Sequence, residues 1–144
     1  MSAAKADAPS VVILELCLPA LDVVTPRILS RVDTAVARAG LKDLCDDVQI
    51  VLAEALNNIA EHAYGRVALG AVSVTVARHG NDLCIDIADW GRPIIEHAVH
   101  DATGPAPEDL AEGGYGRFLI QALSSEARYS RSGGRNNLFL RLTA

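Results

Sequence analysis

Residues 51–65 read VLAEALNNIAEHAYG, and this stretch decides the fold because it carries two helical patterns at once. An apolar residue recurs every three or four positions from 44 to 59, which predicts an amphipathic helix over about 42–64 that ends at Gly65. The helix therefore has one face for a core and another face for solvent or a ligand.

Three polar residues of this helix, Glu54, Asn58 and His62, recur every four positions. They are predicted to lie on one face opposite the apolar stripe, with about 40° of drift per step. A carboxylate there suits a general base, and a carboxamide oxygen is a ligand for Mg²⁺ carried in by phosphates. The spacing alone leaves open that these residues are only the solvated face of the helix.

The sequence around this helix predicts further strands and helices. Preceding it are a strand over 11–18 and a helix with apolar positions from 21 to 39, which ends at Gly40. Following it are strands over 68–78 and 82–89, a helix opened by the glycines of 113–116, and a closing hairpin around Gly133 and Gly134. We expect a flexible tail over 1–9 and a single domain over 10–144.

The segment 91–113 has no periodicity and contains several prolines and acids. A loop of this length inside a compact domain tends to be functional, so we expect a lid or a binding loop.

Composition limits the kinds of ligand and compartment. Eighteen acidic against thirteen basic residues give a net charge of −5, which disfavours nucleic-acid binding and requires that any phosphate be held locally. The three cysteines have no CxxC spacing, which fits a reducing cytosol. Residues 1–9 lack an apolar segment and no apolar run approaches roughly 20 residues, so a cytoplasmic protein is expected.

Asp89 ends the strand over 82–89 with the same parity as its apolar residues, so it should face the core. A buried carboxylate needs a partner, and the exocyclic amine of a purine is one. Gly91 would let the backbone approach a flat ring closely. An exposed aspartate at a strand end is the alternative.

Gly114, Tyr115 and Gly116 open a helix whose first turn also contains Arg117. Unpaired N–H groups at a helix N-terminus suit a phosphate, and an arginine is unfavourable there unless an anion is near. Glycines also serve as plain hinges and caps, so this motif alone leaves both readings open.

Taken in order, these elements resemble the ATP-binding fold shared by gyrase, Hsp90, histidine kinases and MutL. Within that superfamily, residues 51–65 and 114–120 (GYGRFLI) are similar to the anti-sigma factor serine kinases of bacterial partner-switching systems. The resemblance implies an α/β two-layer sandwich, in which a mixed, mostly antiparallel sheet is covered on one face by three main helices.

The resemblance also implies roles for individual residues. Glu54 would be the catalytic base, Asn58 the Mg²⁺ ligand, and Asp89 the adenine-binding carboxylate beside Gly91. The remaining nucleotide-binding positions that it implies are His62, Gly114, Tyr115, Gly116, Arg117 and Asn137, where Asn137 aligns with a threonine of the family. Arg31 falls where the family has a partner-binding arginine. Pro93 departs from the family, because it replaces a flexible position in the adenine loop.

The function implied is that of an ATP- and Mg²⁺-dependent protein serine kinase. It would phosphorylate an anti-anti-sigma partner of the STAS fold, sequester an alternative sigma factor, and act as a homodimer. The alternative is a nucleotide-gated partner-binding switch without kinase activity. Retention of Glu54 favours the kinase, because a pure binder has no use for a base beside the γ-phosphate.

Overall fold

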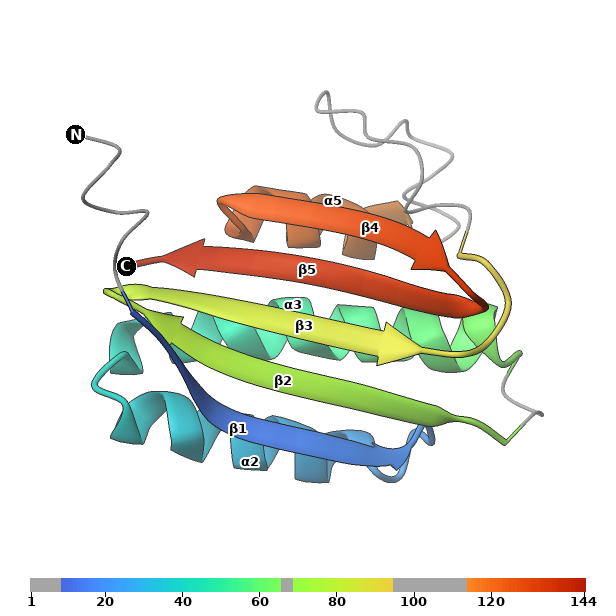
Figure 1. Cartoon of the computed structure of the whole chain (residues 1–144), viewed down its shortest axis with the longest axis horizontal. Helices are drawn as coiled ribbons and strands as arrows, with labels where there is room; N and C mark the ends of the chain where they lie inside the picture. The colour runs from blue at the N-terminus through green and yellow to red at the C-terminus, as the bar shows by residue number, and fades with distance from the viewer. Residues whose placement is uncertain (1–8, 66–68, 95–113) are drawn as a thin grey trace.

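The computed structural model describes residues 9–65, 69–94 and 114–144. They form a five-stranded sheet in the order β1-β2-β3-β5-β4 (Figure 1). The strands are β1 (Ser10–Pro19), β2 (Ala71–His79), β3 (Asp82–Asp89), β4 (Glu126–Ser132) and β5 (Arg135–Thr143). Every pairing within the described residues is antiparallel, so the sheet is more regular than the mixed one expected.

Tight turns join two pairs of strands. Gly80 has φ of +64° between β2 and β3, and Gly133 and Gly134 have φ of +59° and +76° between β4 and β5. Two successive positive φ values match the right-handed twist of a hairpin, and glycine adopts them without steric cost. The predicted hairpins are therefore confirmed.

The helices lie on one face of the sheet (Figure 1). They are α2 (Thr25–Arg38), the 3₁₀ turn η1 (Lys42–Leu44), α3 (Cys45–Asn58), the π turn η2 (Ile59–Ala63) and α5 (Gly114–Leu123). The predicted apolar stripe of α3 is buried, and it packs on alternate residues of the three central strands, which are also buried. The two-layer arrangement expected from the sequence is thus confirmed.

The predicted helix over 42–64 is present in three pieces rather than one. After Asn58 the hydrogen bonds widen, and the Tyr64 amide donates to the Ile59 carbonyl at 3.1 Å, an i to i+5 bond. A π turn rotates the residues that follow it away from α-helical register. Most of the expected lid, residues 95–113, and the tail over 1–8 lie outside the described residues.

Among the described residues, no helix is both long and apolar enough to cross a membrane.

Candidate functional site

Asp89 is buried at the end of β3, with 2% of its surface exposed. It lies opposite Asn136 of β5 in the strand register. Its Oδ1 accepts hydrogen bonds from the Gly91 amide at 2.9 Å and from Asn136 Nδ2 at 2.8 Å. Within the described residues Oδ2 accepts none. The predicted core-facing orientation of Asp89 is confirmed, and one carboxylate oxygen remains as an acceptor.

Burial raises the pKa of Asp89, because desolvation disfavours the charged form. The hydrogen bonds from Asn136 and from the Gly91 amide, together with the positive charge of Arg131, act in the opposite direction. A buried carboxylate that has one oxygen without a hydrogen bond is stabilised most by a ligand that donates an N–H to that oxygen. The exocyclic amine of adenine fits this requirement.

Gly91 lies against the end of the π turn. The Arg92 amide donates to the Ala63 carbonyl at 2.8 Å. A Cβ built on Gly91 would lie 2.4 Å from that carbonyl oxygen, so no side chain fits there. Gly91 thus makes a close backbone approach to η2, which places the loop after Asp89 against the end of the helix that carries Asn58. Its approach to a flat ring stays a prediction.

Tyr64 fixes the same region from the other side. Its hydroxyl donates to the Ala71 carbonyl at 2.7 Å and accepts from the Trp90 amide at 2.9 Å. These bonds connect the end of η2 to β2 and to the residue after Asp89. Tyr64 is thus an anchor for the backbone around the carboxylate.

Asn137 is not brought to Asp89. It lies on the opposite face of β5, where its Nδ2 donates to Asp86 Oδ1 at 3.3 Å. The position facing Asp89 is occupied by Asn136, which sequence reasoning missed, and we replace Asn137 by Asn136 in the candidate site. The parity of β5 carried the signal, since Asn136 alternates with the buried Leu138 and Leu140 and Asn137 does not.

Glu54 and Asn58 are both half-buried, one turn apart on α3. The Glu54 carboxylate lies directly over Gly116 of α5, because a Cβ built on Gly116 would be 2.2 Å from Glu54 Oε2. A helix N-terminus carries a partial positive charge and free N–H groups. The structure therefore brings the candidate base and the candidate phosphate-binding turn together.

His62 differs from the other two polar residues of the predicted face. It lies within η2, its side chain is 40% exposed, and its Nε2 is 4.0 Å from Glu61 Oε2. Because the π turn intervenes after Asn58, the four-residue spacing no longer stacks His62 over Asn58. Among the described residues, no hydrogen bond joins His62 to Asn58 or Asp89.

The first turn of α5 contains the rest of the predicted motif. Gly114 begins the helix, Gly116 is buried against Glu54, and Arg117 is half-buried. The side chain of Tyr115 and the whole of Gly113 lie outside the described residues. The backbone of this turn is suited to an anion.

Asn58 fits a role as one oxygen ligand of Mg²⁺. The described residues contain no cluster of three or more His, Cys, Asp or Glu side chains that would hold a metal by themselves. Mg²⁺ characteristically uses one or two protein oxygens together with substrate phosphates and water. The single oxygen of Asn58 thus suits a Mg²⁺ ion whose other ligands are nucleotide phosphates and water.

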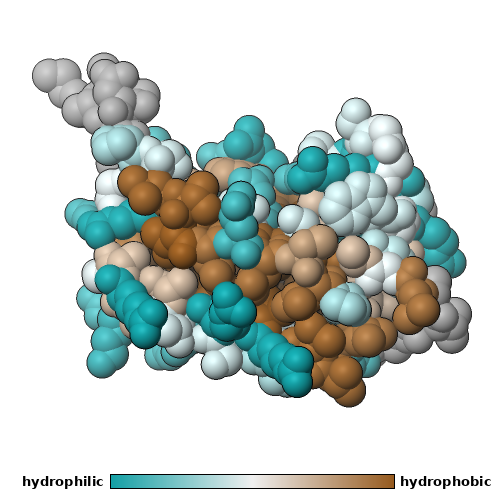
Figure 2. Space-filling view, turned by 60° about the horizontal axis from the view of Figure 1, so that its bottom comes forward, coloured by the Kyte–Doolittle hydropathy of each residue, from teal (hydrophilic) through white to brown (hydrophobic). Residues whose placement is uncertain are grey.

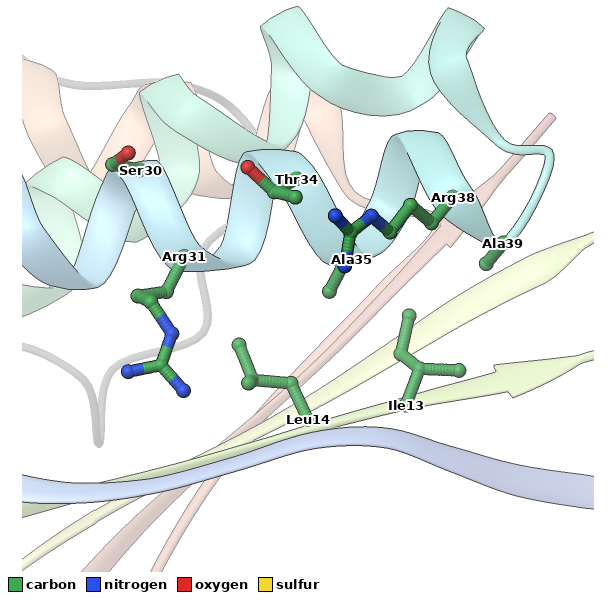
Figure 3. Close-up of a pocket in the computed structure, with 8 residues that line it drawn as sticks. All are labelled: Ile13, Leu14, Ser30, Arg31, Thr34, Ala35, Arg38 and Ala39. Atoms are coloured by element: carbon green, nitrogen blue, oxygen red, sulfur yellow. The ribbon is translucent and has the colours of Figure 1, made fainter.

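A second feature is a groove of about 590 Å³ between α2 and β1. Its lining residues are Ile13, Leu14, Ser30, Arg31, Thr34, Ala35, Arg38 and Ala39. Figure 3 shows Ile13 and Leu14 on β1 facing the helix, with Arg31 extending from α2 toward the strand. Figure 2 shows an apolar band along this face, bordered by hydrophilic side chains.

The groove is positively charged although the chain is acidic. Its lining includes two arginines and no carboxylate. Neither Arg31 nor Arg38 forms an ion pair within the part of the chain that the structure describes. The predicted partner-binding residue, Arg31, therefore lies on a groove with an apolar floor and unpaired cations.

The fold and this site together define the class of protein. The chain belongs to the family of histidine kinase-like ATPase domains, whose family model matches residues 18–142.

Similar curated proteins include several serine-protein kinases named RsbW. The protein from Oceanobacillus iheyensis is 31% identical over 94 residues, which cover 62% of this chain and 60% of the relative. That from Bacillus licheniformis is 34% identical over 97 residues, covering 64% and 61%. That from Staphylococcus epidermidis is 28% identical over 128 residues, covering 84% and 80%. The chain spans about three fifths of the length of the first two.

A solved structure has the same fold. The crystal structure of the RsbU and RsbW domains of Rv1364c from Mycobacterium tuberculosis covers 94% of this chain, with a TM-score of 0.65 and 20% identity. This chain covers 32% of that larger protein.

Proposed function

We propose that this protein is an ATP-dependent protein serine kinase that also acts as an anti-sigma factor. One observation carries the proposal: the Glu54 carboxylate lies over Gly116 at the start of α5. Glu54 is on α3, the helix that also positions Asn58. A protein that only binds ATP has no need for a base beside the phosphate-binding turn. The similarity to RsbW serine-protein kinases supports the same assignment.

Nucleotide binding uses three parts of the site. Asp89 Oδ2 accepts the exocyclic amine of adenine, and the first turn of α5 donates its free N–H groups to the phosphates. Asn58 contributes one oxygen ligand to Mg²⁺. When bound, Mg²⁺ offsets the negative charge of the phosphates.

The chemical step requires positioning and one base. Glu54 orients the acceptor serine hydroxyl and takes its proton. The serine oxygen forms a bond to the γ-phosphorus, the bond between that phosphorus and the β,γ-bridging oxygen breaks, and ADP leaves. Little other covalent chemistry is needed from the protein, because phosphoryl transfer depends mainly on alignment and charge.

The groove between α2 and β1 is the proposed contact for protein partners. Its apolar floor and the unpaired Arg31 and Arg38 fit a segment that has both apolar and acidic side chains. The partners are a STAS-domain anti-anti-sigma protein and an alternative sigma factor, which compete for an overlapping surface. We expect a cytoplasmic homodimer.

Phosphorylation of the STAS partner would favour its release. A phosphoserine adds about two negative charges, and it would lie beside a protein of net charge −5. Repulsion then weakens the product complex, and the freed kinase binds sigma.

The direct test is phosphate transfer to a STAS partner. The protein is incubated with γ-labelled ATP, Mg²⁺ and STAS proteins encoded near its gene, and the labelled residue is identified by mass spectrometry. The proposal predicts label on one serine. Label on no partner, alongside measurable ATP binding, would contradict the kinase and favour the nucleotide-gated switch.

A further inference from the structure

The side chains behind Asp89 form a connected set, which we call the amide clamp: Asn136 of β5 with Arg131 and Tyr129 of β4. Asn136 is 2% exposed, and all of its polar positions are used. Its Nδ2 donates to Asp89 Oδ1 and to the Arg92 carbonyl, both at 2.8 Å. Its Oδ1 accepts from Arg131 Nη1 at 2.8 Å and from the Tyr129 hydroxyl.

These bonds allow only one orientation of the Asn136 amide. A flipped amide would place its oxygen against the Asp89 carboxylate and the Arg92 carbonyl, and its N–H groups against the Arg131 donor. Two acceptors, or two donors, facing each other in a buried site are costly. Arg131 and Tyr129 therefore hold Asn136 as a donor toward Asp89.

The clamp also holds the loop that follows Asp89. Arg131 Nη1 donates to the Gly91 carbonyl at 2.9 Å, and the Ile94 amide donates to the Tyr129 hydroxyl at 3.2 Å. Together with the bond from Asn136 to the Arg92 carbonyl, β4 and β5 contact this loop at three points. The loop thus has a fixed path even though Pro93 replaces a flexible position.

We propose that Asn136, held by Arg131 and Tyr129, is a positioning residue that makes this site selective for 6-aminopurine nucleotides. The inference rests on the proposed function, because it concerns the same nucleotide site. Asn136 and the Gly91 amide occupy Oδ1, so Oδ2 is the acceptor that faces the base. An acceptor there attracts a 6-amino group and repels a 6-oxo group.

Selectivity requires that Asp89 stay ionised, since a protonated carboxyl could donate to a 6-oxo group. The charged and titratable groups that face Asp89 are Arg131 from β4 and the Tyr64 phenol at the end of η2. Burial raises the pKa of Tyr64 further above neutrality, so the phenol stays uncharged when Asp89 titrates.

The test compares binding of ATP and ITP, which has a 6-oxo group in place of the amine. Trp90 is the single tryptophan, it adjoins Asp89 and it is 49% exposed, so its fluorescence reports binding. Asn136→Ala is expected to weaken ATP binding about ten- to hundredfold and to reduce the preference for ATP over ITP. Asn137→Ala, next in sequence on the opposite face, is the matched control and should bind as the parent does.

Two further readouts separate positioning from a general loss of structure. In Asn136→Ala the midpoint at which ATP binding is lost on acidification should move to higher pH, because a bond that stabilises the carboxylate is gone. Arg131→Ala changes an exposed residue, and it should shift the ATP to ITP ratio in the same direction by less.

An unchanged ATP to ITP ratio in both Asn136→Ala and Arg131→Ala, with ATP bound normally by the parent protein, would overturn the clamp and leave the kinase proposal standing. A parent protein that binds neither nucleotide would instead overturn the nucleotide site and the clamp with it.

Discussion

At the scale of single residues, Asp89 combines a cost in stability with a proposed role in nucleotide binding. Burial raises its pKa above the ordinary 3.8, so the folded chain holds the Asp89 proton more tightly than the unfolded chain. The stability that this proton contributes is fully present below about pH 3.8 and is lost as pH rises through the raised pKa. At neutral pH the ionised carboxylate therefore destabilises the protein in the absence of a ligand.

Asp89→Asn should separate these two effects. The new amide keeps an acceptor toward Asn136 and Gly91 but turns its N–H₂ toward the base, so ATP binding should fall on the order of 100-fold. The melting temperature at pH 7 should be unchanged or higher than that of the parent, and this difference should vanish toward pH 4. Calorimetric titration and thermal melting measure both. A variant that melts much lower at pH 7 would contradict this description of Asp89.

Gly116→Ala should impair catalysis without harming the fold. The added methyl group would lie 2.2 Å from Glu54 Oε2, so the carboxylate must move. A shift of about 1 Å can cost on the order of 100-fold in rate. The melting temperature should not fall, because alanine favours a helix more than glycine does. Transfer at the parent rate would show that the position of Glu54 over Gly116 has no bearing on the reaction.

At the scale of elements, the site depends on where strands and helices end. β3 ends at Asp89, α3 ends at Asn58, and the π turn η2 brings Ala63 against the loop after β3. The β4–β5 hairpin reaches the same loop with Arg131 and Asn136. Four elements, β3, η2, β4 and β5, thus meet at one short loop.

The hairpin turn itself should matter for stability only. Gly134 has φ of +76° and no neighbouring atom within 4 Å of a built Cβ. Gly134→Ala should therefore cost about 1 kcal/mol of unfolding free energy from backbone strain. ATP affinity and transfer rate should not change, which is the opposite of the pattern expected for Gly116→Ala. Denaturant unfolding and ATP titration measure the two quantities, and a large loss of ATP binding would contradict the separation.

The sequence predicted these elements well where a local pattern exists. The alternation of Leu83, Ile85 and Ile87 placed Asp89 toward the core, and the glycine pairs placed the hairpins. The π turn was missed because the apolar spacing of residues 44–59 is helical throughout and carries no signal for the change from i+4 to i+5 hydrogen bonds. Asn136 was missed because alignment with the family's threonine placed Asn137 in the site. The alternation of buried residues along β5 selects Asn136 instead.

At the scale of the whole molecule, two sites with different ligands lie on an acidic protein. The proposed nucleotide site would bind anions through backbone N–H groups and a metal, whereas the groove between α2 and β1 is cationic through Arg31 and Arg38. Neither proposed site depends on the net charge of −5, which in our proposal instead repels the phosphorylated partner.

Arg31→Glu should therefore weaken binding of the STAS and sigma partners and leave ATP affinity unchanged. A reversed charge in the groove would repel acidic partner residues and should cost at least tenfold in affinity. Arg27→Glu makes the same change at an exposed position of α2 outside the groove and is the control. Equal losses for both variants in surface plasmon resonance would show that long-range charge, not the groove, governs the association.

The central claim is that Glu54 is the base of a phosphoryl transfer, and the rate of a single turnover tests it most directly. The parent and Glu54→Gln are compared at saturating Mg-ATP with the STAS partner, and ATP affinity is measured alongside. For Glu54→Gln we expect transfer slower by about 10²- to 10⁴-fold, with ATP affinity within about threefold of the parent. Transfer by Glu54→Gln at the parent rate would contradict it.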